Sequence, residues 1–198
     1  MSRLELIIGG MFSGKSSELI RRLKRYKAID KKVLVINSSK DTRCGDNLIQ
    51  THDKVVFDCV KTNDLSSVSF DDFDIIGIDE AQFFSGLVHF VYEALNNDKH
   101  VIVAGLDGDS SQRPFGEILN LIPLCDDVHK LKALCMECKD GTLAPFSKRI
   151  PGNSSDQELI GSNDIYKAVC RNHLFDPMDL LIEAVVNEFM EDHQDLRC

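Results

Sequence analysis

A glycine-rich segment near the start of the chain constrains the fold more than any other feature. Residues 9–16 read Gly-Gly-Met-Phe-Ser-Gly-Lys-Ser and match the phosphate-binding pattern Gly-x-x-x-x-Gly-Lys-Ser/Thr at every fixed position. An apolar run, Leu4–Ile8, precedes it, and a helix-forming run, Ser17–Leu23, follows it. Glycines let successive backbone N–H groups turn toward phosphate oxygens, and the helix adds the positive end of its dipole. The sequence therefore predicts a strand, a loop and a helix that bind a nucleoside triphosphate.

Two side chains of this loop have specific expected contacts. Lys15 is expected to reach the outer phosphates, and the Ser16 hydroxyl is expected to ligate Mg²⁺. The alternative is a glycine turn with a chance lysine, and the position between a strand and a helix argues against it. The predicted phosphate-binding residues of the loop are Gly9, Gly10, Met11, Phe12, Ser13, Gly14, Lys15 and Ser16.

An acid pair supplies a second predicted element of the nucleotide site. Residues 75–80, Ile-Ile-Gly-Ile-Asp-Glu, read as a buried strand with two carboxylates at its carboxyl end. Asp79 is expected to hold Mg²⁺ directly or through water. Glu80 is expected to act as a general base on the attacking hydroxyl, which requires a carboxylate within about 3 Å of it. Acids at strand ends are common, so it is the phosphate loop upstream that favours this interpretation.

Apolar runs alternate with amphipathic stretches through the first two-thirds of the chain. Strands are predicted at Lys32–Asn37, Phe73–Asp79 and His100–Leu106, a helix at Gly86–Asn97, and a loop near the site at Ser38–Lys54. Strands that are apolar on both faces and alternate with helices predict an α/β fold with a mostly parallel sheet covered on each side. The phosphate loop is then expected at the carboxyl edge of that sheet.

Four residues in the last third have the spacing of metal ligands. Cys135-x-x-Cys138 and Cys170-x-x-His173 form a Cys₃His set, which predicts a closed, structural zinc site rather than a catalytic one. Buried cysteines with a chance histidine are the alternative. No secretory signal is seen, so disulfides are not expected, and the remaining thiols are predicted to be unpaired. These are Cys44, Cys59, Cys125 and Cys198.

Composition changes near the first of these cysteines and suggests a small second domain. Gly, Pro, Ser and Asn become frequent, and a last amphipathic stretch, Pro177–His193, predicts a helix. The predicted division is a nucleotide-binding domain at 1–134, a zinc-ribbon domain at 135–176 and a helical extension at 177–198. 

Charge and hydropathy exclude several classes of protein. The net charge is −9, which argues against a domain that coats nucleic acid. The basic residues of the first helix are expected to form a solvated face. No apolar run approaches the roughly 20 residues of a membrane span, and no signal-peptide core is seen, so a cytoplasmic protein, or a nuclear one that is imported, is expected.

Taken together, these motifs resemble the thymidine kinases of vertebrate cytosol, many bacteria and poxviruses. The resemblance runs from Leu4 to about His173. It rests on linked motifs in the same order, namely residues 9–22, Asp41-Thr-Arg43, Thr51-His-Asp53, residues 78–84, Pro114-Phe-Gly116, Cys135-Met-Glu-Cys138, Ser147-Lys-Arg149, and Tyr166 ahead of Cys170-Arg-Asn-His173.

The resemblance implies a RecA-like core with a zinc ribbon and a lasso loop at Arg149–Ile160. It implies transfer of the γ-phosphoryl group of ATP to the 5′-hydroxyl of deoxythymidine, with deoxyuridine as a further expected substrate. Glu80 corresponds to the catalytic base, and Asp41, Arg43 and Gln82 to residues around the phosphates. A homotetramer inhibited by thymidine triphosphate is expected. The positions that surround the nucleoside are Met11, Phe83, Phe115, Arg149, Gln157, Leu159, Ile160 and Tyr166.

Several positions depart from the family's usual pattern. Gly10 stands where many relatives have proline, and Ala81 where many have glycine. By alignment Ser110 replaces a phenylalanine near the nucleoside, which removes on the order of 1–3 kcal/mol of apolar contact. Gln157 replaces a residue that is commonly aliphatic. Substrate breadth is therefore less constrained by the sequence than reaction type.

Three other functions were compared with this interpretation. A nucleotide-switch GTPase needs an Asn-Lys-x-Asp signature, which is absent from the sequence. A zinc-bearing RecA-like ATPase acting on DNA is disfavoured by the acidic balance and the short chain. An inactive relative that only binds is disfavoured because Lys15, Asp79 and Glu80 are all present.

Overall fold

A parallel β-sheet forms the centre of the molecule. The computed structural model describes residues 1–41, 48–50, 56–150 and 165–175. Within these ranges the main sheet has six strands in the order β5-β2-β6-β7-β1-β8, and every neighbouring pair is parallel. The strands are β1 (Arg3–Gly9), β2 (Val33–Ser38), β5 (Val60–Thr62), β6 (Ile75–Asp79), β7 (His100–Gly105) and β8 (Asp127–Leu131).

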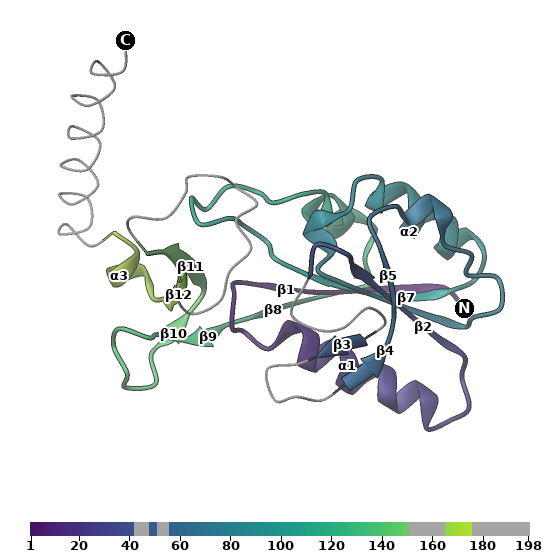
Figure 1. The fold of residues 1–198 in the computed structure, drawn as a ribbon, viewed down its shortest axis with the longest axis horizontal. Helices are drawn as coiled ribbons and strands as arrows, with labels where there is room; N and C mark the ends of the chain where they lie inside the picture. Colours follow the sequence, from purple (N-terminus) through teal and green to yellow (C-terminus); the bar gives the residue numbers. More distant parts are fainter. Residues whose placement is uncertain (42–47, 51–55, 151–164, 176–198) are drawn as a thin grey trace, which may run out of the picture.

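Helices cover both faces of this sheet (Figure 1). Helix α1 (Lys15–Lys27) buries Leu19, Ile20 and Leu23 against one face. Helix α2 (Leu87–Asn96) and the 3₁₀ helix η3 (Ile118–Leu124) pack on the other face. Alternate residues of β1 contribute to the two cores: Ile7 packs with α1, whereas Leu6 and Ile8 pack with α2. This alternation explains why the central strands have apolar residues on both faces.

A smaller unit lies next to the carboxyl ends of β1 and β8 (Figure 1). It has its own core cluster, which includes Ala133, Ala144, Ala168 and Val169. We call this unit the ribbon. Its elements are two antiparallel pairs and a short helix: β9 (Ala133–Leu134) with β10 (Leu143–Ala144), β11 (Phe146–Arg149) with β12 (Tyr166–Val169), and α3 (Arg171–Leu174).

The remaining elements are short. Strands β3 (Leu48–Gln50) and β4 (Val56–Asp58) pair antiparallel, and the 3₁₀ helices η1 (Leu65–Ser67) and η2 (Ala81–Phe83) flank β6. None of the helices in the described ranges has the length and apolar composition that a membrane crossing requires.

Most predicted elements agree with the structure to within two residues. The loop prediction for Ser38–Lys54 is wrong at Leu48–Gln50, because these residues pair with β4. The predicted helix at Pro177–His193 lies outside the described residues.

Glu18 in the first turn of α1 provides a test of how this helix is stabilised. Its carboxylate accepts hydrogen bonds from Arg21 at 2.6 Å and from Arg22 at 2.8 Å, and these contacts lower the pKa of Glu18 to about 2. We expect Glu18→Gln to cost about 1 kcal/mol at pH 7, since the helix dipole and both guanidiniums favour the charged form.

The effect of pH follows from the depressed pKa. The stabilisation by Glu18 is fully present above the unfolded pKa of about 4.3 and is lost as pH falls toward about 2. Urea unfolding measures the free energy of unfolding at pH 7 and at pH 3. The decrease in this free energy from pH 7 to pH 3 should be smaller in the Gln variant than in the parent. Glu93→Gln on exposed α2 is the control. Equal losses in the Glu18 variant and the parent would contradict this role.

Candidate active site

The phosphate loop connects β1 to α1, and two of its side chains donate hydrogen bonds to the same carbonyl oxygen. Gly10 O accepts a hydrogen bond from Ser13 Oγ at 2.8 Å and from Lys15 Nζ at 2.7 Å. Gly14 precedes α1 in a left-handed conformation, at φ 85°. Lys15 and Ser16 begin the helix, as the motif predicts, so their side chains start where the helix dipole is positive.

Two neighbours hold this loop from outside. At Gly9 the backbone has φ 144°, and a Cβ atom would lie 2.3 Å from Leu131 O of β8, so only glycine fits there. The backbone N–H of Met11 donates to Ser147 Oγ of β11 at 2.8 Å. Phe12 has a left-handed backbone (φ 62°), and its side chain packs against the ribbon core. The phosphate loop is thus seated between the sheet and the ribbon.

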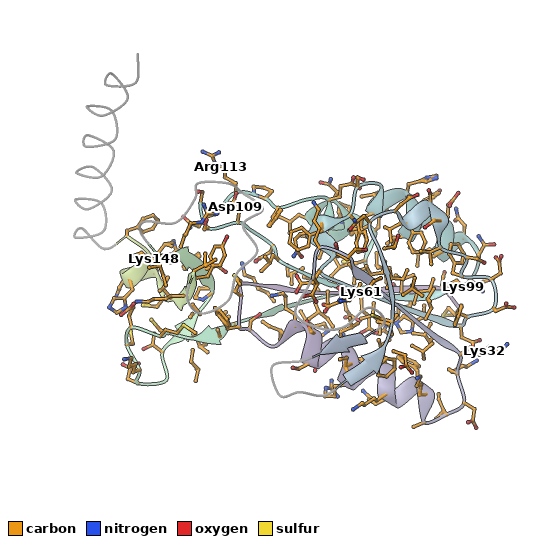
Figure 2. All side chains as sticks on the ribbon, in the orientation of Figure 1. Lys32, Lys61, Lys99, Asp109, Arg113 and Lys148 are labelled. Atoms are coloured by element: carbon orange, nitrogen blue, oxygen red, sulfur yellow. The ribbon has the colours of Figure 1, made fainter. Side chains whose placement is uncertain are left out.

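Two acidic residues lie at the carboxyl edge of the sheet. Asp79 ends β6, is 2% exposed, and is in register with Asn37 at the end of β2. Asn37 Nδ2 donates to Asp41 Oδ2 at 3.0 Å, and Lys61 Nζ donates to Asp41 O at 2.8 Å. Lys61, labelled in Figure 2, belongs to the edge strand β5. The structure therefore brings Asp41 to the same edge as Asp79; the predicted phosphate residue Arg43 is outside the described residues.

Glu80 follows β6 directly and adopts a left-handed backbone, with φ 50° and ψ 39°. Its carboxylate Oε2 accepts a hydrogen bond from Gln82 Nε2 at 2.7 Å. Gln82 is buried, and its Oε1 accepts the backbone N–H of Leu106 at 2.9 Å. The side chain of Gln82, predicted to lie by the phosphates, thus links Glu80 to the residue that follows β7.

Two aromatic residues predicted to surround the nucleoside are in contact. Phe83 and Phe115 pack edge to face with ring centroids 5.6 Å apart. Lys40 Nζ lies 5.5 Å from the centroid of Phe83. Phe83 follows Gln82 directly in the chain, so this aromatic pair joins the segment that carries Glu80 to the segment that carries Phe115.

The segment that leads to Phe115 is a compact turn. Asp109 Oδ1 accepts the N–H groups of Ser111 at 2.8 Å and Arg113 at 2.9 Å. Figure 2 shows Asp109 and Arg113 on the loop that extends toward the ribbon. Ser110 uses its carbonyl oxygen to accept from Gln112 Nε2 at 2.6 Å. Position 110, where the family resemblance predicts a phenylalanine in many members, is here part of this polar turn.

Two further predicted nucleoside residues meet on the ribbon. Arg149 and Tyr166 are register partners on β11 and β12, and Arg149 Nη2 donates to Tyr166 OH at 3.2 Å. The guanidinium carbon lies 5.5 Å from the Tyr166 ring centroid. Met11 is held by Ser147, two residues before Arg149 on the same strand. The predicted lasso residues Gln157, Leu159 and Ile160 are outside the described residues.

The four predicted metal ligands converge. Cys135, Cys138, Cys170 and His173 place their ligand atoms within 4.8 Å of one another, and four of these distances are 3.4–3.8 Å. A zinc ion bound at about 2.3 Å to sulfur and about 2.0 Å to nitrogen separates tetrahedral ligand atoms by roughly 3.5–3.8 Å. The donor set and its spacing therefore fit a zinc ion with all four positions filled by protein.

Backbone groups surround Cys135 and favour its thiolate form. Although burial opposes it, the N–H groups of Cys138, Cys170 and Glu137 lower the pKa of Cys135 to about 6. The bond from Cys170 N to Cys135 Sγ is 3.3 Å long. Lys148, labelled on the ribbon in Figure 2, donates to His173 O at 2.6 Å and ties α3 to β11. Of the other cysteines, Cys59 is buried and Cys125 half-buried, and neither forms a disulfide.

Three contacts of the site were not predicted from the sequence. Ser147 was recognised only as part of a motif, and its hydrogen bond to Met11 spans 136 positions. The hydrogen bond from Asn37 to Asp41 was not predicted, because the sequence shows only that Asn37 ends a predicted strand. The contact between Gln82 and Leu106 depends on how β7 ends beside η2.

The class that the fold defines is an α/β protein with a parallel sheet, which carries an acid pair at the carboxyl edge of that sheet and a Cys₃His cluster that fits zinc. A sequence model of the family described as thymidine kinase matches residues 2–174. The thymidine kinase of Vaccinia virus (strain Western Reserve) is 49% identical over 175 residues, which cover 87% of this chain and 97% of that protein. The thymidine kinase of Monkeypox virus has the same identity and coverage. That of Myxoma virus (strain Uriarra) is 48% identical over 177 residues, 87% of this chain and 96% of that protein.

This chain belongs to the thymidine kinase family, and it is therefore a kinase, an enzyme that transfers a phosphoryl group. The alignment reaches through the ribbon, since the matched residues include all four members of the Cys₃His cluster.

Proposed function

We propose that this protein transfers the γ-phosphoryl group of ATP to the 5′-hydroxyl of deoxythymidine, and also of deoxyuridine. The observation that carries the proposal is the placement of the acid pair and the phosphate loop at one edge of the sheet, in a chain of this family. The core is proposed to be RecA-like, and the position of β7 between β1 and β6 supports this.

The phosphates of ATP are proposed to bind across residues 9–16, with Arg43 and Asp41 beside them. Backbone N–H groups and the start of α1 favour the negative charge. The Ser16 hydroxyl and the buried Asp79 carboxylate are oxygen donors of the kind that Mg²⁺ prefers, and they would hold it there. The metal neutralises charge on the phosphates.

Glu80 is proposed to act as the general base. The nucleoside 5′-oxygen forms a bond to the γ-phosphorus as the bond from that phosphorus to the β,γ-bridging oxygen breaks, which leaves ADP. The hydroxyl proton passes to the Glu80 carboxylate. Because the protein makes no covalent bond to the phosphoryl group, positioning and charge neutralisation account for the rate.

The nucleoside is proposed to bind between the two parts of the molecule. Phe83 and Phe115 supply an apolar wall from the main domain. Met11, Arg149 and Tyr166 lie on the ribbon side, where Ser147 fixes the Met11 backbone. The lasso, with Gln157, Leu159 and Ile160, is proposed to close over the base and exclude water. The polar turn at Ser110 supports a pocket that tolerates more than one pyrimidine base.

The proposal extends to organisation and regulation. The domains are proposed to be residues 1–134, 135–176 and 177–198, with a structural zinc ion in the second. A cytoplasmic homotetramer inhibited by thymidine triphosphate is proposed, with no nucleic acid or membrane partner.

A nucleoside panel tests the proposed reaction. ATP labelled at the γ-phosphate is incubated with the protein, Mg²⁺ and each of the natural nucleosides, and labelled monophosphates are separated. Deoxythymidine should be the best acceptor and deoxyuridine a weaker one. ATP hydrolysis stimulated by single-stranded DNA, with no labelled nucleotide formed, would refute the kinase proposal in favour of a DNA-dependent ATPase.

Lys15 provides a second test. We expect Lys15→Met to reduce kcat/KM for ATP by on the order of 10²–10³-fold, because a cation on the outer phosphates stabilises charge that develops during transfer. Deoxythymidine binding, measured by calorimetry without ATP, should be unchanged. Lys27→Met at the other end of α1 is the matched control. An unchanged kcat/KM for ATP would show that Lys15 does not contact the transferred group.

A further inference from the structure

The backbone conformation of Glu80 requires support from its surroundings. A non-glycine residue at φ 50° and ψ 39° is disfavoured by about 1 kcal/mol or more relative to ordinary conformations. The turn is closed by a backbone hydrogen bond from Phe83 N to Glu80 O at 3.1 Å. This conformation directs the chain away from β6 immediately after Asp79, so the orientation of the Glu80 side chain depends on what contacts it.

The buried side chain of Gln82 contacts the Glu80 carboxylate. Its Nε2 lies 2.7 Å from Glu80 Oε2, within the range of a strong hydrogen bond to a charged acceptor. Gln82 is 3% exposed, so its amide is shielded from competing water. An amide N–H can only donate, and a carboxylate oxygen is the acceptor that suits it.

The other end of the Gln82 amide is fixed to the sheet. Its Oε1 accepts the N–H of Leu106, which follows β7 directly, at 2.9 Å. This bond also sets the amide orientation, because an N–H donor requires the oxygen on that side. The Gln82 amide therefore connects the Glu80 carboxylate to the backbone at the end of β7.

The space around Gln82 is closed by two glycines. A Cβ atom at Gly105 would lie 2.8 Å from Gln82 Oε1. A Cβ at Gly116, which has φ 64°, would lie 2.2 Å from Gln82 O. Both glycines permit a close approach that any larger residue would prevent, so the side chain and backbone of Gln82 have little freedom to move.

We propose that Gln82 is a positioning residue for the general base: it joins the end of β7 to the Glu80 carboxylate and fixes the orientation in which Glu80 receives the 5′-hydroxyl proton. The inference rests on the proposed function of Glu80. That Gln82 binds phosphate stays a prediction; the contacts that its amide makes within the protein are with Glu80 and Leu106.

The test separates positioning from phosphate binding by comparing kcat with KM. Gln82→Met keeps the length of the side chain and removes the amide. It should lower kcat by about 10- to 100-fold, because small misplacements of a reacting group have effects of this size. KM for ATP and deoxythymidine should stay within about threefold of the parent, since the ligands are bound elsewhere. Asn97→Met, which removes an exposed amide bonded to Glu93 O, is the matched control and should leave both unchanged.

A double-mutant cycle shows whether Gln82 acts through Glu80. In a Glu80→Gln background, adding Gln82→Met should change kcat by less than about twofold, because the two residues then act as one unit. A full additional loss would overturn the proposal. A rise in the KM for ATP with kcat unchanged would also overturn the proposal, and it would support phosphate binding by Gln82 instead.

A second variant covers the case in which Gln82→Met does not fold. Gln82→Glu keeps the acceptor for Leu106 N–H and removes the donor to Glu80, and it should lose kcat to a similar extent. Full kcat in a folded Gln82→Glu protein would refute the inference. Failure of the parent protein to phosphorylate any nucleoside would instead refute the proposed function, so the two failures are distinguishable.

Discussion

Replacing Glu80 by glutamine should reduce kcat for deoxythymidine phosphorylation by on the order of 10²–10⁴-fold, the usual contribution of a positioned base. Glutamine keeps the size of the side chain and an oxygen that can accept the Gln82 amide N–H, but it cannot take up the hydroxyl proton. The affinities for ATP and deoxythymidine should be unchanged, because the phosphates and the base are proposed to bind other residues. Single-turnover rates and calorimetric binding to the same preparation measure the two properties separately.

The control for Glu80→Gln is Glu93→Gln, which neutralises an exposed carboxylate on α2. It should have the activity of the parent. If Glu80→Gln retains near-parental turnover, Glu80 is not the base. A matching loss of ATP binding would instead assign Glu80 to the nucleotide or its metal ion.

Local patterns made the strand–loop–helix at residues 9–16, the acid pair and the Cys₃His cluster predictable as structures. Residues 9–16 match a motif of fixed spacing, and Asp79 and Glu80 come at and directly after the end of the apolar strand β6. The Cys₃His set consists of two pairs, Cys135-x-x-Cys138 and Cys170-x-x-His173. The spacing within each pair is visible in the sequence, and only the approach of the two pairs to each other depends on the fold.

Contacts between distant segments were not predictable in the same way. Strands β5 and β8 are short and lie at the edges of the sheet, and β8 is mostly exposed, so neither has an apolar run that predicts a buried strand. Gln82 meets Leu106 because β7 ends beside η2, and Met11 meets Ser147 because the ribbon folds back onto the loop. No spacing rule connects residues that are brought together only by tertiary packing.

Replacing Cys135, a proposed zinc ligand, should affect the phosphate loop as well as the ribbon. The ribbon core is built largely from small residues such as Ala133, Ala144 and Ala168, which bury little apolar area. Metal coordination is therefore expected to supply much of its folding free energy. Cys135→Ser should lose bound zinc and the folded ribbon, measured by metal analysis and by a lowered thermal midpoint.

The same variant should also weaken ATP binding, by roughly tenfold if the coupling is of ordinary size. Ser147 holds the Met11 N–H, and Phe12 packs its side chain into the ribbon core while its own backbone is left-handed. An unfolded ribbon would release both contacts, and the loop would then relax from the conformation that faces the phosphates. Calorimetric titration with ATP measures this effect.

Two further variants separate the coupling between the ribbon and ATP binding from a general loss of stability. Cys125→Ser alters a half-buried thiol outside the cluster and should keep zinc, thermal midpoint and ATP affinity. Phe12→Ala should weaken ATP binding while the zinc content stays at one ion per chain, because it breaks the contact without touching a ligand. A zinc-stripped protein that keeps its thermal midpoint would refute a structural metal. One that loses the ribbon yet binds ATP as tightly as before would show that the loop holds its shape without the ribbon, and that its left-handed turn at Phe12 is stabilised by β1 and α1 alone.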